Sequence, residues 1–171
     1  KIDRMEAVEV NVPNSIWDLA VQLLGEADAT KFIHASVCTV KSHKQVKLGF
    51  WHNSDDRLDF NDGYNFDELK RMPSGSLAVD VGANLGDTAV LIHTENPRLR
   101  VVSLEPSPHN YIYVRWNMLH NKVVELTEAD FSLGKPGVLA LWGGATKDGR
   151  KIELAFSPQH TKLAQMKSSD M

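Results

Sequence analysis

The sequence predicts an α/β fold in which a parallel sheet with flanking helices follows a small α+β segment. Strand-like and helix-like segments alternate from residue 77 onward, in the order β-α-β-α-β with short connections. This order is typical of a parallel sheet covered by helices. The chain has 171 residues, of which 42% are hydrophobic and 24% are charged, so it is long enough to bury a substantial core.

Residues 1–72 are interpreted as a lead segment. Ser15 can accept hydrogen bonds from first-turn amides, and Gly25 can adopt a left-handed exit, so a short helix is expected between them. The stretches that follow are alternating and rich in β-branched residues, which predicts a hairpin. The elements expected after the helix are hairpin strands at 31–40 and 44–52, a polar loop at 53–65 and a short helix at 66–72.

Residues 73–171 are predicted to form a Rossmann-like domain. Its elements are expected to be parallel strands near 77–82, 100–105 and 123–128, with helices at 85–95 and 108–120 between them. Right-handed crossovers would place the strands in the spatial order 3-2-1. Ligands of such sheets bind at the carboxyl ends of the strands. The groups expected to meet there are Asp80–Gly86, Glu105 and residues 128–131.

The turn between the first strand and its helix contains Gly82 and Gly86. In one interpretation the two glycines only permit a tight turn, and no ligand binds there. A dinucleotide site requires glycines at positions one, three and six, but Asn84 and Asp87 occupy the last two positions. A carboxylate at position 87 would also repel a pyrophosphate at the helix N-terminus. The sequence therefore argues against NAD.

A ligand that carries its own positive charge and no phosphate avoids this conflict. S-adenosylmethionine has a sulfonium, an ammonium and a ribose diol. Asp80 can interact with the ammonium, and the backbone of the glycine turn can approach the ligand closely because no side chain intervenes. Glu105, at the end of the second strand, can accept from both ribose hydroxyls. NAD enzymes share this last feature, so Glu105 supports a ribose without selecting the cofactor.

The segments VDVGANLGDTAV and VVSLEPSPHNYIYVRWNMLHN resemble the FkbM family of class I methyltransferases. The first motif of that family reads approximately D-V-G-A-N-x-G-D, its second strand ends in E-P, and its next helix carries N-x-x-x-N. The matching residues here are Asp80–Asp87, Glu105–Pro106, Asn117 and Asn121. The resemblance covers about residues 60–140. It implies a Rossmann-like fold and methyl transfer from S-adenosylmethionine to a hydroxyl or another nucleophile of a small metabolite or glycan-like acceptor.

The glycine turn and the resemblance together indicate a set of cofactor contacts, with two residues after the third strand placed near the adenine. No catalytic base is identified, although a hydroxyl acceptor requires one. The expected cofactor-binding residues are Asp80, Gly82, Ala83, Asn84, Gly86, Glu105, Pro106, Ala129 and Asp130.

The chain departs from the family after Leu133, where members continue with a fourth strand that bears a D-x-E-G-type motif. We therefore expect a fragment or truncated relative with an incomplete sheet and little methyl-transfer activity of its own. The first strand would be an exposed edge, which a hairpin within 140–156 is expected to cover in part. The alternatives are a non-catalytic Rossmann module and, less favoured, an NAD-dependent oxidoreductase.

Charge and composition limit the other classes of partner. The net charge of −3 is spread over interspersed residues of both signs, which argues against nucleic acid and anionic membranes. No apolar run approaches the roughly 20 residues of a membrane span, and no signal segment is recognised, so a cytoplasmic protein is expected. His34 and Cys38 lie four apart in a strand-like context that does not suit a shared metal, so no metal is expected. The oligomeric state is not predicted.

Overall fold

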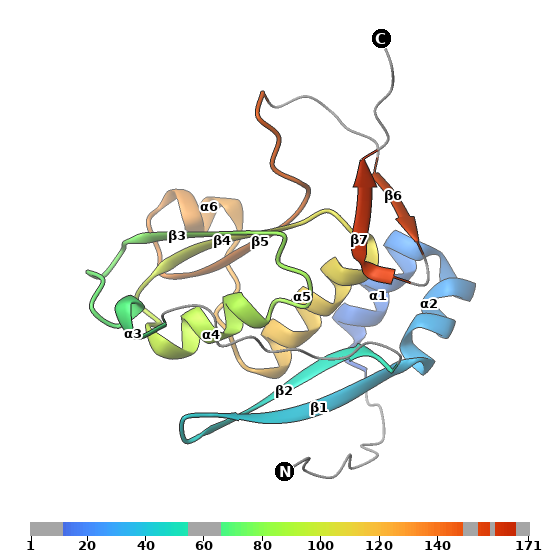
Figure 1. The fold of residues 1–171 in the computed structure, drawn as a ribbon, viewed down its shortest axis with the longest axis horizontal. Helices are drawn as coiled ribbons and strands as arrows, with labels where there is room; N and C mark the ends of the chain where they lie inside the picture. The colour runs from blue at the N-terminus through green and yellow to red at the C-terminus, as the bar shows by residue number, and fades with distance from the viewer. Residues whose placement is uncertain (1–11, 55–65, 149–153, 158–159, 167–171) are drawn as a thin grey trace.

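The structure, a computed structural model, describes residues 12–54, 66–148, 154–157 and 160–166 (Figure 1). It shows a mixed α/β arrangement, as the sequence predicted at that level. Within the described residues the strands form one parallel sheet and two antiparallel pairs. The elements are α1 (Asn14–Leu24), α2 (Glu26–His34), β1 (Ser36–His43), β2 (Val46–Asn53), α3 (Phe66–Leu69), β3 (Leu77–Val81), α4 (Asp87–Glu95), β4 (Arg100–Glu105), α5 (Pro108–His120), α6 (Glu128–Ser132), β5 (Gly137–Trp142), β6 (Leu154–Ser157) and β7 (His160–Met166).

The parallel sheet has the order β3-β4-β5, and both neighbouring pairs are parallel. The prediction is confirmed for the first two strands, since β3 and β4 occupy the expected segments. The helices α4 and α5 likewise lie where helices were predicted. The strands follow one another across the sheet in chain order, which agrees with the predicted sequence of neighbours.

The third strand is not where the sequence analysis placed it. Residues 123–128 contribute only an isolated bridge from Glu125 to Val138, and the strand beside β4 is β5. Residues 137–142 form a continuous apolar run that suits a strand buried by its neighbours. Residues 123–128 contain two acids and run through the N-cap Thr127 into α6. The first strand of the hairpin predicted within 140–156 is therefore also wrong, because residues 140–142 belong to β5, which pairs in parallel with β4.

The lead segment contains the predicted hairpin, with β1 and β2 antiparallel from Ser36 opposite Asn53 onward. The first helix is present, and Gly25 exits it with a φ of 81°, but Ser15 does not cap it; Pro13 takes the N-cap position. Residues 31–34, expected in a strand, complete α2, which carries acids in its first turn and bases in its last, as the helix dipole favours. The short helix after residue 65 is confirmed as α3. Most of the predicted loop, 55–65, lies outside the described residues.

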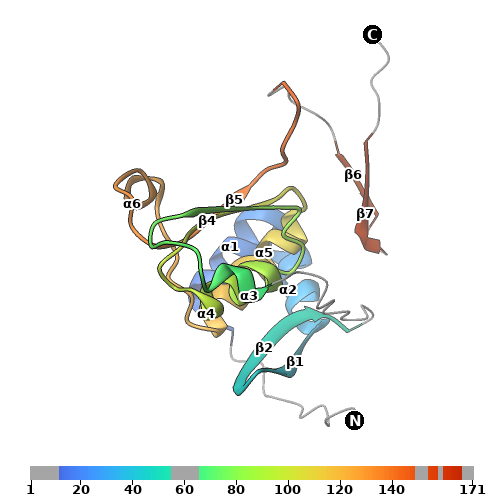
Figure 2. The same ribbon diagram turned by 60° about the vertical axis from the view of Figure 1, so that its left-hand side comes forward.

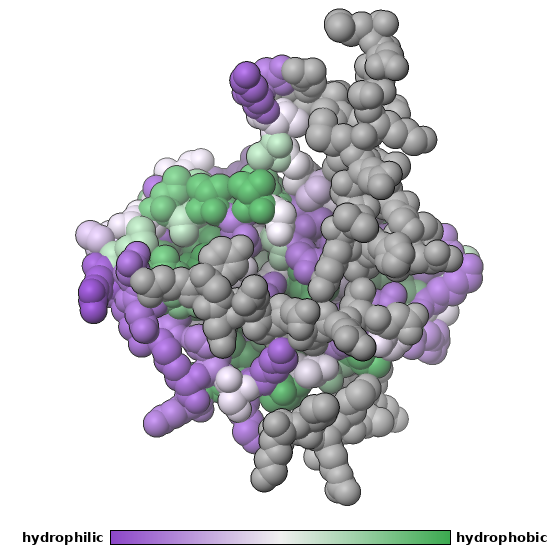
Figure 3. Space-filling view, viewed as in Figure 1, coloured by the Kyte–Doolittle hydropathy of each residue, from purple (hydrophilic) through white to green (hydrophobic). Residues whose placement is uncertain are grey.

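One face of the parallel sheet is open over β3. Leu77, Val79 and Val81 are 50%, 57% and 60% exposed, and they alternate along β3 with partly buried residues. In Figure 3 an apolar patch lies over this strand. Figures 1 and 2 show α4 and α5 on the opposite side of the sheet. None of the helices in the described part of the chain has the length and apolar character that crossing a membrane requires.

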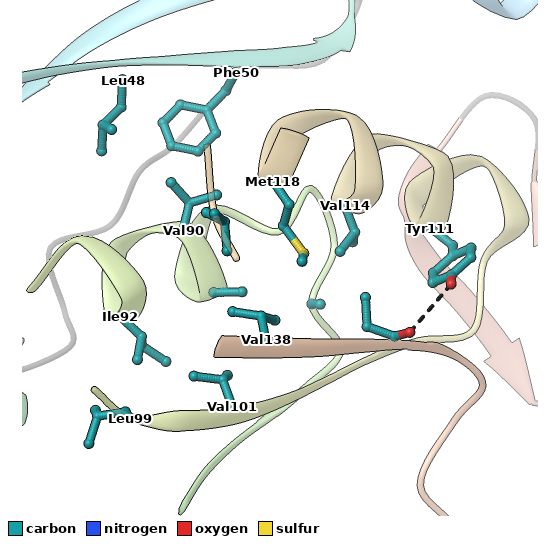
Figure 4. Close-up of a cluster of buried hydrophobic side chains, with 14 of the residues drawn as sticks. Leu48, Phe50, Val90, Ile92, Leu99, Val101, Tyr111, Val114, Met118 and Val138 are labelled. Carbon is teal, nitrogen blue, oxygen red and sulfur yellow. Dashed lines mark hydrogen bonds between the residues drawn. The ribbon is translucent and has the colours of Figure 1, made fainter. Parts of the chain in front are cut away.

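The core lies between the sheet, the two helices α4 and α5, and the hairpin (Figure 4). Leu48 and Phe50 extend from β2 toward the helices, Met118 lies on α5, and Val101 and Val138 come from the sheet. The lead segment therefore shares one core with the segment that follows residue 72. A second cluster joins α1 and α2 to the outer face of α5.

Candidate functional site

The carboxyl ends of the three parallel strands bring together the glycine turn after β3, the start of α5 after β4 and the chain that follows β5. The amides of Gly82 and Ala83 both donate to the Leu104 carbonyl at 2.9 Å, and the Gly143 amide donates to the Glu105 carbonyl at 3.0 Å. Backbone hydrogen bonds thus extend each strand pair into the loops beyond it. This end of the sheet is the candidate site.

The two glycines of the turn have different surroundings. Both have left-handed backbones, with φ of 79° at Gly82 and 78° at Gly86. A side chain at Gly86 would place its Cβ 3.0 Å from the Cα of Val114 on α5, whereas nothing lies within 4 Å of the Cβ position at Gly82. Asn84, between them, is also left-handed with a φ of 52°, which asparagine tolerates. Gly86 is therefore explained by helix packing alone, and Gly82 leaves its backbone open to a ligand.

Asp80 is a half-buried carboxylate near the end of β3. Burial raises its pKa to about 6, the charge of nearby Asp87 adds to this, and a hydrogen bond from the Ser103 hydroxyl at 3.1 Å opposes it. Asp80 takes part in none of the ion pairs of the described residues. No ion pair among the described residues therefore compensates its charge, and a cation at this position would be stabilised.

Glu105 links two loops through its carboxylate. It is 5% exposed; Oε2 accepts from the Asn84 amide at 2.7 Å and Oε1 accepts from the Ser107 amide at 2.8 Å. Burial raises its pKa, hydrogen bonds from the two amides and from the Asn110 side chain lower it, and the charge of Asp80 raises it again. This bracing role was not predicted from the sequence. A ribose would have to use the lone pairs that the two amides and the Asn110 side chain leave available.

Two residues at this end of the sheet were not among the predicted contacts. Trp142, the last residue of β5, is 54% exposed, and its indole N–H donates to the Pro106 carbonyl at 2.9 Å. A Cβ on Gly144 would lie 3.7 Å from the Cβ of Pro106. Trp142 and Gly144 thus flank the E-P turn. The signal that could have found them is the strand-like run that ends in W-G-G, which parallels the ending of β3 on a glycine.

The predicted contribution of Ala129 and Asp130 to this end of the sheet is wrong. Both lie in α6, which precedes β5, and the guanidinium of Arg100 at the start of β4 donates to the Phe131 carbonyl at 2.9 Å. Helix α6 is therefore at the amino ends of the strands. Asp130 instead accepts from Lys135 at 2.6 Å. The error follows from placing the third strand before α6, since a residue after that strand would have lain at the carboxyl end.

Metal ligation and similarity to known proteins add nothing to this geometry. Within residues 12–54 and 66–148, no group of three or more His, Cys, Asp or Glu residues could hold a metal ion. Comparison of the chain with protein-family models, with curated proteins and with solved structures finds no match in any of the three. The function proposed below therefore rests on the site itself.

Proposed function

We propose that the chain binds S-adenosylmethionine at the carboxyl end of the parallel sheet, as the cofactor-binding part of an FkbM-like methyltransferase. The observation that carries the proposal is Asp80, a half-buried carboxylate with a pKa raised to about 6 and no cationic partner in the described residues. A group of this kind favours a ligand that brings a positive charge. The ammonium of S-adenosylmethionine supplies one without any phosphate.

The other groups at this end of the sheet fit the rest of such a ligand. The open side of Gly82 gives a ligand access to the backbone, and Glu105 retains lone pairs for ribose hydroxyls. In this proposal the adenine lies against Trp142 and Gly144, and not against Ala129 and Asp130 of α6 as the sequence predicted. An exposed indole offers a flat apolar surface for a base. Methyl transfer needs donor and acceptor held in line, and the acceptor is proposed to be a small molecule with a hydroxyl.

The arrangement supports a Rossmann-like sheet and disfavours a dinucleotide. Strands and helices alternate as β3-α4-β4-α5, with β5 on the far side of β4. A pyrophosphate would lie at the N-terminus of α4, where Asp87 is the first helical residue. The second candidate is a non-catalytic module of the same kind. The exposed apolar residues along β3 favour it, because a sheet complete on both sides would cover them.

Titration calorimetry with S-adenosylhomocysteine tests the proposal, with NAD as the comparison ligand. We expect S-adenosylhomocysteine to bind and NAD to bind at least ~10-fold more weakly, which corresponds to about 1.4 kcal/mol. Binding of NAD in preference, or no binding of the nucleoside, would overturn the cofactor assignment.

A pair of glycine variants locates the ligand. Gly82→Asn keeps the left-handed backbone, since asparagine tolerates positive φ, but fills the open side of the turn. Gly134→Asn is the matched control, because Gly134 has a φ of 75° and equally open surroundings after α6, near the opposite end of the sheet. We expect Gly82→Asn to abolish binding and Gly134→Asn to leave it unchanged. Equal effects of the two would place the ligand elsewhere.

A further inference from the structure

Two asparagines of α5 pair with the backbone of β2. The amide of Trp51 donates to Asn117 Oδ1 at 2.5 Å, and Asn117 Nδ2 donates to the Trp51 carbonyl at 3.0 Å. One turn later, the amide of Gly49 donates to Asn121 Oδ1 at 3.1 Å, and Asn121 Nδ2 donates to the Gly49 carbonyl at 2.8 Å. Residues two apart in a strand direct their N–H and C=O groups to the same edge, and side chains four apart share one helix face. The two carboxamides thus replace a neighbouring strand for the hairpin.

Gly49 of β2 faces the side chain of His120, the last residue of α5. A Cβ at Gly49 would lie 2.5 Å from Nε2 of the His120 side chain, so a larger residue there would require the imidazole to move. Trp51 then stacks on Trp116 with ring centroids 4.3 Å apart. The hairpin is therefore held to α5 by hydrogen bonds and by aromatic packing together.

Asn117 differs from Asn121 in one contact. Its Nδ2 also donates to the Leu85 carbonyl at 2.8 Å, within the glycine turn. The second donor bond of Asn121 goes instead to the Asn117 carbonyl in its own helix, at 2.8 Å. Asn117 is fully buried, so these bonds are shielded from competing water. A single carboxamide thus joins the hairpin to the turn that borders the candidate site.

The turn is otherwise held from its sheet side and from the start of α5. Glu105 accepts from the Asn84 amide, and the Asn110 side chain donates to Asn84 Oδ1 at 3.2 Å. On the hairpin side, Leu85 shares a buried cluster with Trp51, and its carbonyl accepts the hydrogen bond from Asn117. We infer that Asn117 is a positioning residue for the glycine turn, and that the hairpin acts through it to hold the turn in its ligand-binding form. This inference rests on the proposed function.

The experiment compares Asn117→Asp with Asn121→Asp. Each variant keeps the Oδ1 acceptor and loses the donors of two hydrogen bonds, but only the first loses the bond to Leu85. We expect Asn117→Asp to weaken S-adenosylhomocysteine binding by ~10-fold or more and Asn121→Asp by less than ~2-fold. Amide hydrogen exchange of Asn84 and Gly86 in the ligand-free protein should accelerate in Asn117→Asp alone. Equal effects of the two variants on binding and exchange would overturn the inference.

Two further outcomes separate this inference from the proposed function. If the wild-type protein does not bind S-adenosylhomocysteine, the proposed function fails, and the exchange rates of the ligand-free variants still decide the role of Asn117. If Asn117→Asp does not fold, hydrogen exchange of the wild-type protein with and without S-adenosylhomocysteine tests the inference. Coupling between sites is reciprocal, so the ligand should then slow exchange of the Trp51 amide in the hairpin. Slower exchange confined to the turn would contradict the coupling.

Discussion

Replacing Asp80 by asparagine should stabilise the ligand-free protein at neutral pH. The pKa of this carboxyl is raised to about 6 from an ordinary 3.8, chiefly by burial. Between these two pH values the folded protein binds more protons than the unfolded chain, so stability falls as the pH rises through that window and stays low above it. At about 1.4 kcal/mol per pKa unit, the penalty at pH 7 amounts to about 3 kcal/mol. Asparagine removes the charge and keeps an oxygen that can accept from Ser103.

Urea unfolding at pH 4 and pH 7 measures this effect. We expect Asp80→Asn to raise the free energy of unfolding by about 1–3 kcal/mol at pH 7, and the difference to shrink toward zero near pH 4. Asp130→Asn is the matched control, since hydrogen bonds from Lys135 and Thr127 lower the pKa of that acid, and no gain is expected there. A loss of stability in Asp80→Asn at pH 7, or a gain that does not depend on pH, would refute the reasoning.

The same substitution should act in the opposite direction on ligand binding. A carboxylate that costs stability in the free protein and lacks a cationic partner is compensated when a cationic ligand binds. Asp80→Asn should therefore weaken S-adenosylhomocysteine binding while it stabilises the free protein. Wild-type affinity should rise between pH 5 and pH 7 as Asp80 ionises. Calorimetry at both pH values checks the pair of effects, and a variant that binds as tightly as the wild type would exclude Asp80 from the site.

Three further predictions concern stability and ligand contact. Burial opposes ionisation of Glu95, but hydrogen bonds from two lysines and a histidine lower its pKa to about 2. In urea unfolding, Glu95→Gln should therefore lower the free energy of unfolding by about 1–2 kcal/mol at pH 7, and this difference should vanish as the pH falls toward 2. Gly86→Ala should cost about 2–3 kcal/mol in the same assay and Gly82→Ala about 1, since only the first meets Val114. Trp142→Ala should weaken calorimetric S-adenosylhomocysteine binding by ~5-fold or more.

Outcomes against these three predictions are distinct. A pH-independent effect of Glu95→Gln would show that its hydrogen bonds, and not its charge, stabilise the fold. Equal costs for the two glycine variants would mean that α5 yields to the added methyl group. Unchanged binding in Trp142→Ala would leave the end of β5 outside the site.

The sequence correctly predicted those elements for which the local residue pattern favours the same secondary structure that tertiary packing requires. Segments 77–81 and 100–105 alternate or run apolar between a turn and a glycine or proline, and both became strands. Helix α5 starts at a serine whose hydroxyl accepts from the Asn110 amide, followed by proline at the first helical position. Such signals are short-range, so a single sequence suffices to find them.

The prediction of the third strand was wrong because two segments, 123–128 and 137–142, both suit the position beside β4. Residues 123–128 have the right distance from α5 for a short connection, and 137–142 have the stronger apolar run. The structure uses both, with the first reduced to a bridge and the second paired along its full length. A Cβ at Gly137 would lie 2.6 Å from the Val124 carbonyl, so this glycine lets the two segments run side by side. Local propensity does not reveal a close approach of this kind.

The candidate site shows the same limit for individual side chains. Asp80 and Glu105 are both acids near strand ends, and the sequence predicts a ligand contact for each without showing which of them the fold itself occupies. The structure does separate them, because two backbone amides and the Asn110 side chain donate to Glu105, whereas Asp80 receives one hydroxyl and, within the part of the chain that the structure describes, no ion pair. A carboxylate whose hydrogen bonds are all made within the fold has a structural role. A buried carboxylate whose charge destabilises the fold indicates a partner outside it. Asp80 is therefore the stronger candidate for a ligand contact, and we expect substitution of Glu105 to disturb both loops, which would mask any loss of a ribose contact.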